Sequence, residues 1–124
     1  MIQGQQASAS AAQITQIKAA SDSQRSTVPV STGGTATLIW SASLKRSAIV
    51  VQGIDRLAGG KTYELWYVDG SGATPAGIFD ANGASQSVVL TGAMKAGDSV
   101  GMTIEPSGGS PSPTSTPIAV FATT

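Results

Sequence analysis

The spacing of apolar residues divides the chain near residue 27. Residues 5–26 are rich in Ala, Gln and Ser and contain two large apolar side chains, Ile14 and Ile17, three positions apart. Ala and Gln favour a helix, but an apolar stripe this narrow attaches a helix only weakly to a core. We therefore expect residues 1–26 to form a partly helical stalk or linker, with Ile14 and Ile17 as its candidate docking side chains.

After residue 27 the apolar residues follow a period of two instead. Short runs rich in β-branched and aromatic residues are separated by Gly-Gly, Asp-Gly and Asn-Gly turns, which is typical of antiparallel sheets. The predicted strands cover residues 35–40, 48–51, 61–68, 76–79, 87–90, 99–105 and 118–122. No helical pattern of useful length separates them, so a parallel α/β sheet is not expected. We predict an all-β fold, an antiparallel β-sandwich of about seven strands over residues 27–124.

Two of the predicted strands, residues 61–68 and 99–105, alternate their side chains between two faces. The core-facing positions are Leu65, Val100, Met102 and Ile104. If these strands pair, the positions on the opposite face lie about 5 Å apart and share one surface. That candidate interaction surface consists of Glu64, Trp66, Thr103 and Glu105. A purely structural alternative stays open, in which Trp66 covers the second face of the sheet and Glu64 is solvated.

The loop after the sixth predicted strand is unusually rich in Pro, Gly, Ser and Thr. This segment, residues 106–117, is called the strap below. Its prolines fix φ and remove backbone donors, so it loses little entropy on folding. We expect the strap to cross from one sheet to the other and to deliver residues 118–121 as an edge or closing strand. The Glu105 carboxylate is expected to hold the strap by accepting hydrogen bonds from the amides of Gly108, Gly109 and Ser110.

The composition excludes several classes of function. Charged residues make up 11% of the chain, and seven basic side chains balance seven acidic ones. Because no basic cluster exists to attract phosphates, nucleic acid is not expected as a partner. The chain has no His and no Cys, which rules out Cys/His zinc sites, catalysis by a Ser-His-Asp or Cys-His set, and disulfides.

Acid–base catalysis by two carboxylates is the one enzymatic arrangement that this composition permits. Most of the Asp residues adjoin Gly or lie in loops, where Asp is a common turn former. The turns at residues 69–72 and 80–83 lack the ligand spacing of a calcium loop. We therefore predict no catalytic residue, no metal site and no cofactor. The carboxylates considered are Asp55, Glu64, Asp69, Asp80, Asp98 and Glu105.

No apolar run approaches the ~20 residues that a membrane-spanning helix needs. The N-terminus also lacks the basic start and apolar centre of a signal peptide. Two interpretations follow: the protein is cytoplasmic, or the sequence is a piece of a longer protein whose targeting segment lies elsewhere.

Four segments in this order resemble a known family. They are G-G-T-A-T-L-I-W-S (33–41), G-K-T-Y-E-L-W-Y-V-D-G (60–70), A-G-I-F (76–79) and T-I-E-P-S-G-G-S-P-S-P-T-S-T-P (103–117). Together they resemble the C-terminal, extracytoplasmic domain of RskA-type anti-sigma-K factors. The similarity covers about residues 15–124, because A-A-S-D-S-Q (19–24) also matches the segment by which the family enters its first strand.

The resemblance implies a single-pass bacterial membrane protein with this β domain on the extracytoplasmic side. A cytoplasmic domain would bind the sigma factor and a spanning helix would carry the anchor, and neither is present in this sequence. Residues 1–26 would be the juxtamembrane stalk, Met1 a start residue, and the partner acting on the stalk a site-1-type protease. The stalk would be protected by docking on its own domain or on a second copy, as in a homodimer.

A second function from a different class stays open. The chain could be a stand-alone extracytoplasmic binding or adhesion module, with Trp66 and the nearby tyrosines stacking on a sugar or peptide. A reading frame upstream that encodes a spanning helix and a small helical domain would decide for the anti-sigma factor.

Overall fold

The computed structural model describes the backbone of residues 2–123 and the side chains of residues 11–123. Within this part, one helix precedes eight strands. The elements are α1 (Ile2–Ala19), β1 (Gln24–Pro29), β2 (Thr35–Ser41), β3 (Arg46–Gln52), β4 (Lys61–Asp69), β5 (Gly72–Phe79), β6 (Gln86–Val89), β7 (Ser99–Pro106) and β8 (Ala119–Ala122).

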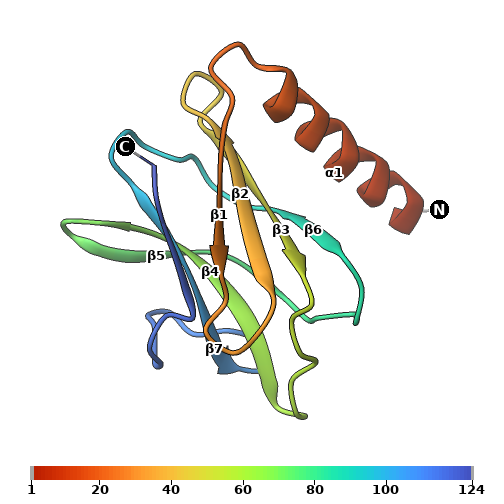
Figure 1. Ribbon diagram of the computed structural model, residues 1–124, viewed down its shortest axis with the longest axis vertical. Helices are drawn as coiled ribbons and strands as arrows, with labels where there is room; N and C mark the ends of the chain where they lie inside the picture. The colour runs from red at the N-terminus through yellow and green to blue at the C-terminus, as the bar shows by residue number, and fades with distance from the viewer. Residues whose placement is uncertain (1, 124) are drawn as a thin grey trace.

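The strands form two four-stranded antiparallel sheets packed face to face, which confirms the predicted β-sandwich (Figure 1). One sheet has the order β1-β2-β3-β6, and we call it the helix-covered sheet. The other has the order β5-β4-β7-β8, and we call it the strap-covered sheet. The pairing of strands that the candidate interaction surface requires is present. β4 and β7 are neighbours, and Leu65 and Met102 are cross-strand partners.

The core between the sheets is built from alternate residues of each strand, as a period of two requires. Tyr63, Leu65 and Tyr67 point inward from β4, and Tyr63 stacks on Phe79 with ring centroids 5.3 Å apart. Ala36, Leu38 and Trp40 of β2 are also buried there, as are Val100 and Met102, which were predicted to face the core. Ile104 is partly buried against the same cluster.

Two features of the strand assignment differ from the prediction. The structure has an eighth strand, β1, which begins at Gln24, inside the segment assigned to the stalk. The sequence Q-R-S-T-V-P gave no apolar alternation because β1 is an edge strand in which no residue is fully buried. In addition, β5 begins at Gly72 and continues through Pro75, which an edge strand tolerates.

The predicted path of the strap is wrong. The strap does not cross to the other sheet, because β8 lies antiparallel beside β7 in the same sheet. Ile118 starts this pairing by donating its amide to the Met102 carbonyl at 2.8 Å. Since β8 is the edge strand of its sheet, the prediction of an edge position is correct.

The helix α1 contacts β2, β3 and β6 and lies against the outer side of their sheet (Figure 1). It is the one helix in the part of the chain that the structure describes, and it is too polar to cross a membrane. The fold therefore has three layers at this point: the helix, the helix-covered sheet and the strap-covered sheet.

Candidate functional site

The four residues of the candidate surface lie together on the outer face of the strap-covered sheet. Glu64 on β4 is the cross-strand partner of Thr103 on β7. Trp66 donates its indole N–H to the Thr103 hydroxyl at 2.8 Å, and that hydroxyl donates to Glu105 Oε2 at 2.6 Å. Sequence reasoning thus identified a true cluster, because both strands use the same alternation.

The strap is hydrogen-bonded across this face by both carboxylates. Glu64 Oε1 accepts the Ser110 amide at 2.7 Å, and Glu105 accepts the amide and hydroxyl of Thr114. The Ser115 hydroxyl donates to the Ile104 carbonyl at 2.7 Å. The strap is therefore a cover for the outer face of β4 and β7.

The predicted partners of Glu105 are wrong in detail. Its carboxylate does not receive the amides of Gly108, Gly109 and Ser110; it receives Thr114 and Thr103 instead. The reason is the path of the strap, which first passes over β4, where Ser110 meets Glu64, and returns over β7 four residues later. Two carboxylates thus hold the strap at two points, where the sequence suggested one.

The environment keeps Glu105 ionised. Burial would raise the pKa of this carboxyl, but hydrogen bonds from Thr103 and Thr114 outweigh it and lower the pKa to about 2. The side chain is fully buried, so a protonated or missing carboxylate would leave its donors without a partner.

The same burial bears on the proposed interaction surface. All four side chains are at most 3% exposed, with Trp66 at 1% and Glu105 at 0%. A partner could reach them only after the strap moved away. As an interaction surface the four residues stay a prediction, and their present contacts are those of a structural cluster.

A glycine lets the strap approach this closely. Gly109 has φ +85°, and a Cβ added to it would lie 2.9 Å from Ile78 Cγ2 and 3.2 Å from Glu64 Oε1. Gly108 has φ +92° but open space around it.

We expect Gly108→Ala to lower the free energy of unfolding by about 1–2 kcal/mol from backbone strain alone. Gly109→Ala should cost about 1 kcal/mol more because of the added overlap. Urea unfolding measures both losses, and equal losses would mean that the strap at Gly109 is not closely packed on Ile78 and Glu64.

The stalk also has a defined contact with the domain. Ile17 is 1% exposed and lies in a small cluster with Ile39 of β2 and Ala48 of β3. Ile14 is partly buried against the same cluster, as is Val50 of β3. The two isoleucines singled out in the sequence are therefore the side chains that face the helix-covered sheet, one turn apart as their spacing requires.

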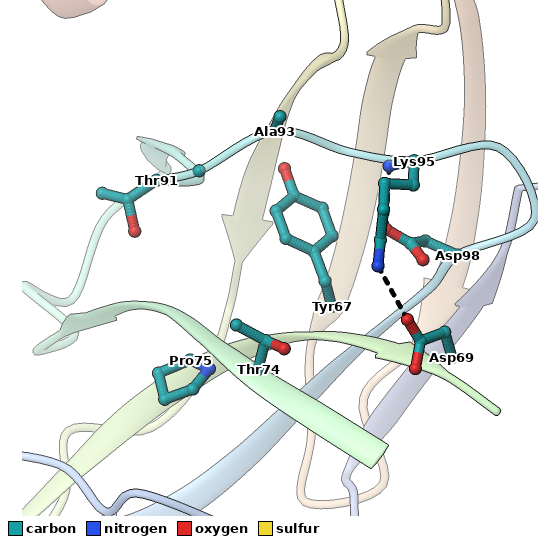
Figure 2. Close-up of a pocket in the computed structure, with 9 residues that line it drawn as sticks. Tyr67, Asp69, Thr74, Pro75, Thr91, Ala93, Lys95 and Asp98 are labelled. Carbon is teal, nitrogen blue, oxygen red and sulfur yellow. Dashed lines mark hydrogen bonds and ion pairs between the residues drawn. The ribbon is translucent and has the colours of Figure 1, made fainter. Parts of the chain in front are cut away.

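A small pocket lies between the β4–β5 hairpin and the loop before β7 (Figure 2). It has a volume of about 190 Å³. Asp69 pairs with Lys95 at 2.9 Å across its mouth, and hydrogen bonds from the Ser71 hydroxyl and from Lys95 lower the pKa of this carboxyl. Tyr67 bonds to Ser47 at 2.7 Å, and Asp98 accepts the Lys95 amide at 2.8 Å. These polar groups therefore fasten the loops to one another and to the opposite sheet.

The chain matches the family model described as "Anti-sigma-K factor rskA, C-terminal" over residues 1–118. It belongs to this family. The family predicted from the four sequence segments is thereby confirmed, and the match extends through the stalk to Ile118, at the end of the strap.

Three relatives are similar to most of the chain. A protein of Streptomyces griseus, described as uncharacterized and lying in the phr 5′ region, is 30% identical over 119 residues, or 96% of this chain and 50% of that protein. The anti-sigma-K factor RskA of Mycolicibacterium vanbaalenii is 32% identical over 107 residues, or 83% of this chain and 43% of the relative. That of Mycobacterium ulcerans is 34% identical over 89 residues, 70% of this chain and 38% of the relative.

The chain spans half or less of the length of these relatives. No solved structure is significantly similar to it.

Sequence reasoning named Ser110 as a residue that bonds the strap, but to Glu105 and not to Glu64. It missed two other residues that the geometry makes important: Thr114 bonds the strap to Glu105, and Asp22 bonds the end of the stalk to the domain. Both are small polar residues in a Ser/Thr-rich chain, so composition gave no signal that separates them from their neighbours. For Asp22 a weak signal existed: it is the one acidic residue among residues 1–54.

Proposed function

We propose that this chain is the extracytoplasmic regulatory domain of a membrane-anchored anti-sigma factor. In this proposal it catalyses nothing and controls release of the sigma factor through proteolysis of the stalk. Family membership supports the anti-sigma role. The sigma factor would bind a cytoplasmic domain, and the membrane anchor would precede the stalk, both outside the residues of this chain.

The observation that carries the regulatory part is the way the stalk is held. Two isoleucines attach α1 to the sheet, and burying them contributes at most ~3–6 kcal/mol before entropy. Opening a strand of the sandwich costs nearly as much free energy as global unfolding. An element with few apolar contacts opens locally at a lower free energy. A protease needs an extended segment, so α1 is the part of the domain that becomes available first.

The proposed protection of the stalk uses contacts within one chain. Ile17 is buried against Ile39 and Ala48 of its own sandwich. A signal that weakens this docking would expose residues 1–23 while leaving the sandwich folded. A second copy of the domain is therefore not required by the proposal, although it could add to the protection.

The alternative binding-module function needs an exposed aromatic ring, and the sequence has only six aromatic residues. All six are buried: Trp40, Trp66, Tyr63, Tyr67, Phe79 and Phe121. Stacking on a sugar or peptide therefore has no surface residue to use, and we do not propose this function.

Enzymatic use of the carboxylates has little support either. Glu64 and Glu105, the two that share a face, already accept hydrogen bonds from the strap. Among the described residues no three potential metal ligands of the His, Cys, Asp or Glu type come together.

The proposal is tested in the natural host with the full-length protein and a reporter driven by its sigma factor. Ile17→Ser should raise reporter output, because docking is weakened and cleavage becomes easier. Ile78→Ser is the matched control, since Ile78 is 46% exposed on the other sheet and does not contact α1. A protease added outside intact cells should remove the domain. A domain that stays resistant there, together with a reporter that ignores Ile17→Ser, would refute the proposal.

A further inference from the structure

The junction between α1 and β1 is short and tightly organised. At the end of the helix the Ala20 amide donates to the Gln16 carbonyl at 3.1 Å. The Ser23 amide then donates to the Ala20 carbonyl at 3.0 Å. The first strand then begins at Gln24. Asp22 lies in the middle of this junction, so any contact it makes fixes the point at which the stalk leaves the sandwich.

The Asp22 carboxylate is bonded to the turn between β2 and β3. Oδ1 accepts the hydroxyl of Ser41 at 2.6 Å and that of Ser43 at 3.0 Å. Oδ2 accepts the Ser43 amide at 2.8 Å. Three donors from one turn thus converge on one side chain that lies 19–21 residues away in the sequence.

The turn is itself fixed to the rest of the domain. The buried Ser41 hydroxyl accepts the Leu44 amide at 3.2 Å, which closes the turn from inside. On its far side the Lys45 carbonyl accepts the Met94 amide at 3.0 Å. Because the turn is rigidly placed, bonds to it hold the end of α1 in place too.

Apolar packing alone does not hold the last turn of α1 against the sandwich. A gap of about 150 Å³ separates the helix from the β2–β3 turn, lined by Gln13, Gln16, Ile17, Leu44 and Arg46. Leu44 is 44% exposed and does not close the gap. Beyond Ile17, the described contacts that tie the end of the helix to the sandwich are therefore those of Asp22.

We propose that Asp22 is the positioning residue for the stalk, and that its bonds to Ser41 and Ser43 set how firmly α1 docks. Ile17 and Asp22 hold the helix at two points, so loss of either lets the helix swing away. The importance of this docking for proteolysis rests on the proposed function. The docking itself is a property of the isolated domain, and the Ser41 and Ser43 bonds also lower the pKa of Asp22, which keeps it ionised.

The test is hydrogen–deuterium exchange of the whole chain, read on amides within residues 11–19. Asp22→Ala should speed their exchange about tenfold or more, because hydrogen bonds to a charged acceptor are lost. Asp22→Asn should have a smaller effect, since its Oδ1 still accepts the serine hydroxyls while its Nδ2 cannot accept the Ser43 amide. Asp69→Asn is the matched control, because it removes a turn carboxylate bonded to Ser71 and Lys95 far from α1.

The assignment is supported if α1 exchanges faster in the Asp22 variants while β4 and β7 of the same variants exchange as in the wild type. In Asp69→Asn, exchange of α1 should be unchanged. Unchanged α1 exchange in Asp22→Ala overturns it. Faster exchange confined to the β2–β3 turn, or spread equally over the sandwich, also overturns it, because Asp22 would then be a turn former or a general stabiliser. The measurement needs no protease and no sigma factor. Its result is therefore independent of the cellular reporter that tests the proposed function.

Discussion

Replacing Glu105 with Ala is expected to lower the free energy of unfolding by roughly 2–4 kcal/mol. The carboxylate is completely buried and accepts hydrogen bonds from Thr103 and Thr114. Its removal leaves these donors unsatisfied, and of the strap's side-chain bonds to β7 it keeps only that of Ser115 to the Ile104 carbonyl. The loss is measured by urea or thermal unfolding of the purified chain.

Two variants isolate the cause of this loss. Glu105→Gln keeps the size of the side chain and one acceptor oxygen, so it should lose less than the Ala variant. Asp80→Ala removes an exposed carboxylate and should change stability by no more than about 0.5 kcal/mol. If Glu105→Ala is no more harmful than Asp80→Ala, the strap is not held by Glu105.

The same carboxylate gives the domain an acid dependence with a definite sign. Because the pKa of Glu105 falls from 4.5 to about 2 on folding, its stabilisation is complete above about pH 4.5. It is lost as the pH decreases towards 2. Asp22 and Asp69 also have lowered pKa values and act in the same direction. The stability of Glu105→Ala should therefore fall less steeply in acid than that of the wild type, without becoming flat.

The sequence was most informative where one rule of local geometry decided the outcome. Alternation on residues 61–68 and 99–105 correctly separated Leu65 and Met102 from Glu64 and Glu105, because neighbouring residues of a strand must face opposite sides. The narrow stripe of Ile14 and Ile17 is the part of α1 that packs against Ile39 and Ala48. Both features depend only on positions close together in the chain.

It was least informative where distant segments meet. The strap could join either sheet on the evidence of its prolines, and only the pairing of β8 with β7 decides its path. The partners of Glu105 follow from that path and could not be listed in advance. β1 was missed because an exposed edge strand needs no apolar alternation. Asp22 shows the same limit, since its partners are about twenty residues away and lie on another element.

The second large effect is expected at Ile17. This side chain is 1% exposed, and its burial contributes about 1.5–3 kcal/mol to docking of the stalk. Serine at this position recovers almost none of that contribution. The population of the undocked helix should therefore rise roughly 10- to 100-fold. Cleavage within the stalk should rise by the same factor when opening is fast relative to cutting. The sandwich should stay intact, because its core is a separate cluster.

Limited proteolysis of the purified chain tests the central claim, that docking of α1 controls access to the stalk. The wild type should be cut first within residues 1–23, before β1 begins. Ile17→Ser, and more strongly Ile14→Ser combined with Ile17→Ser, should be cut there faster, while Ile78→Ser matches the wild type. A first cut inside residues 24–124, or an unchanged rate of stalk cleavage in the double variant, would contradict the account.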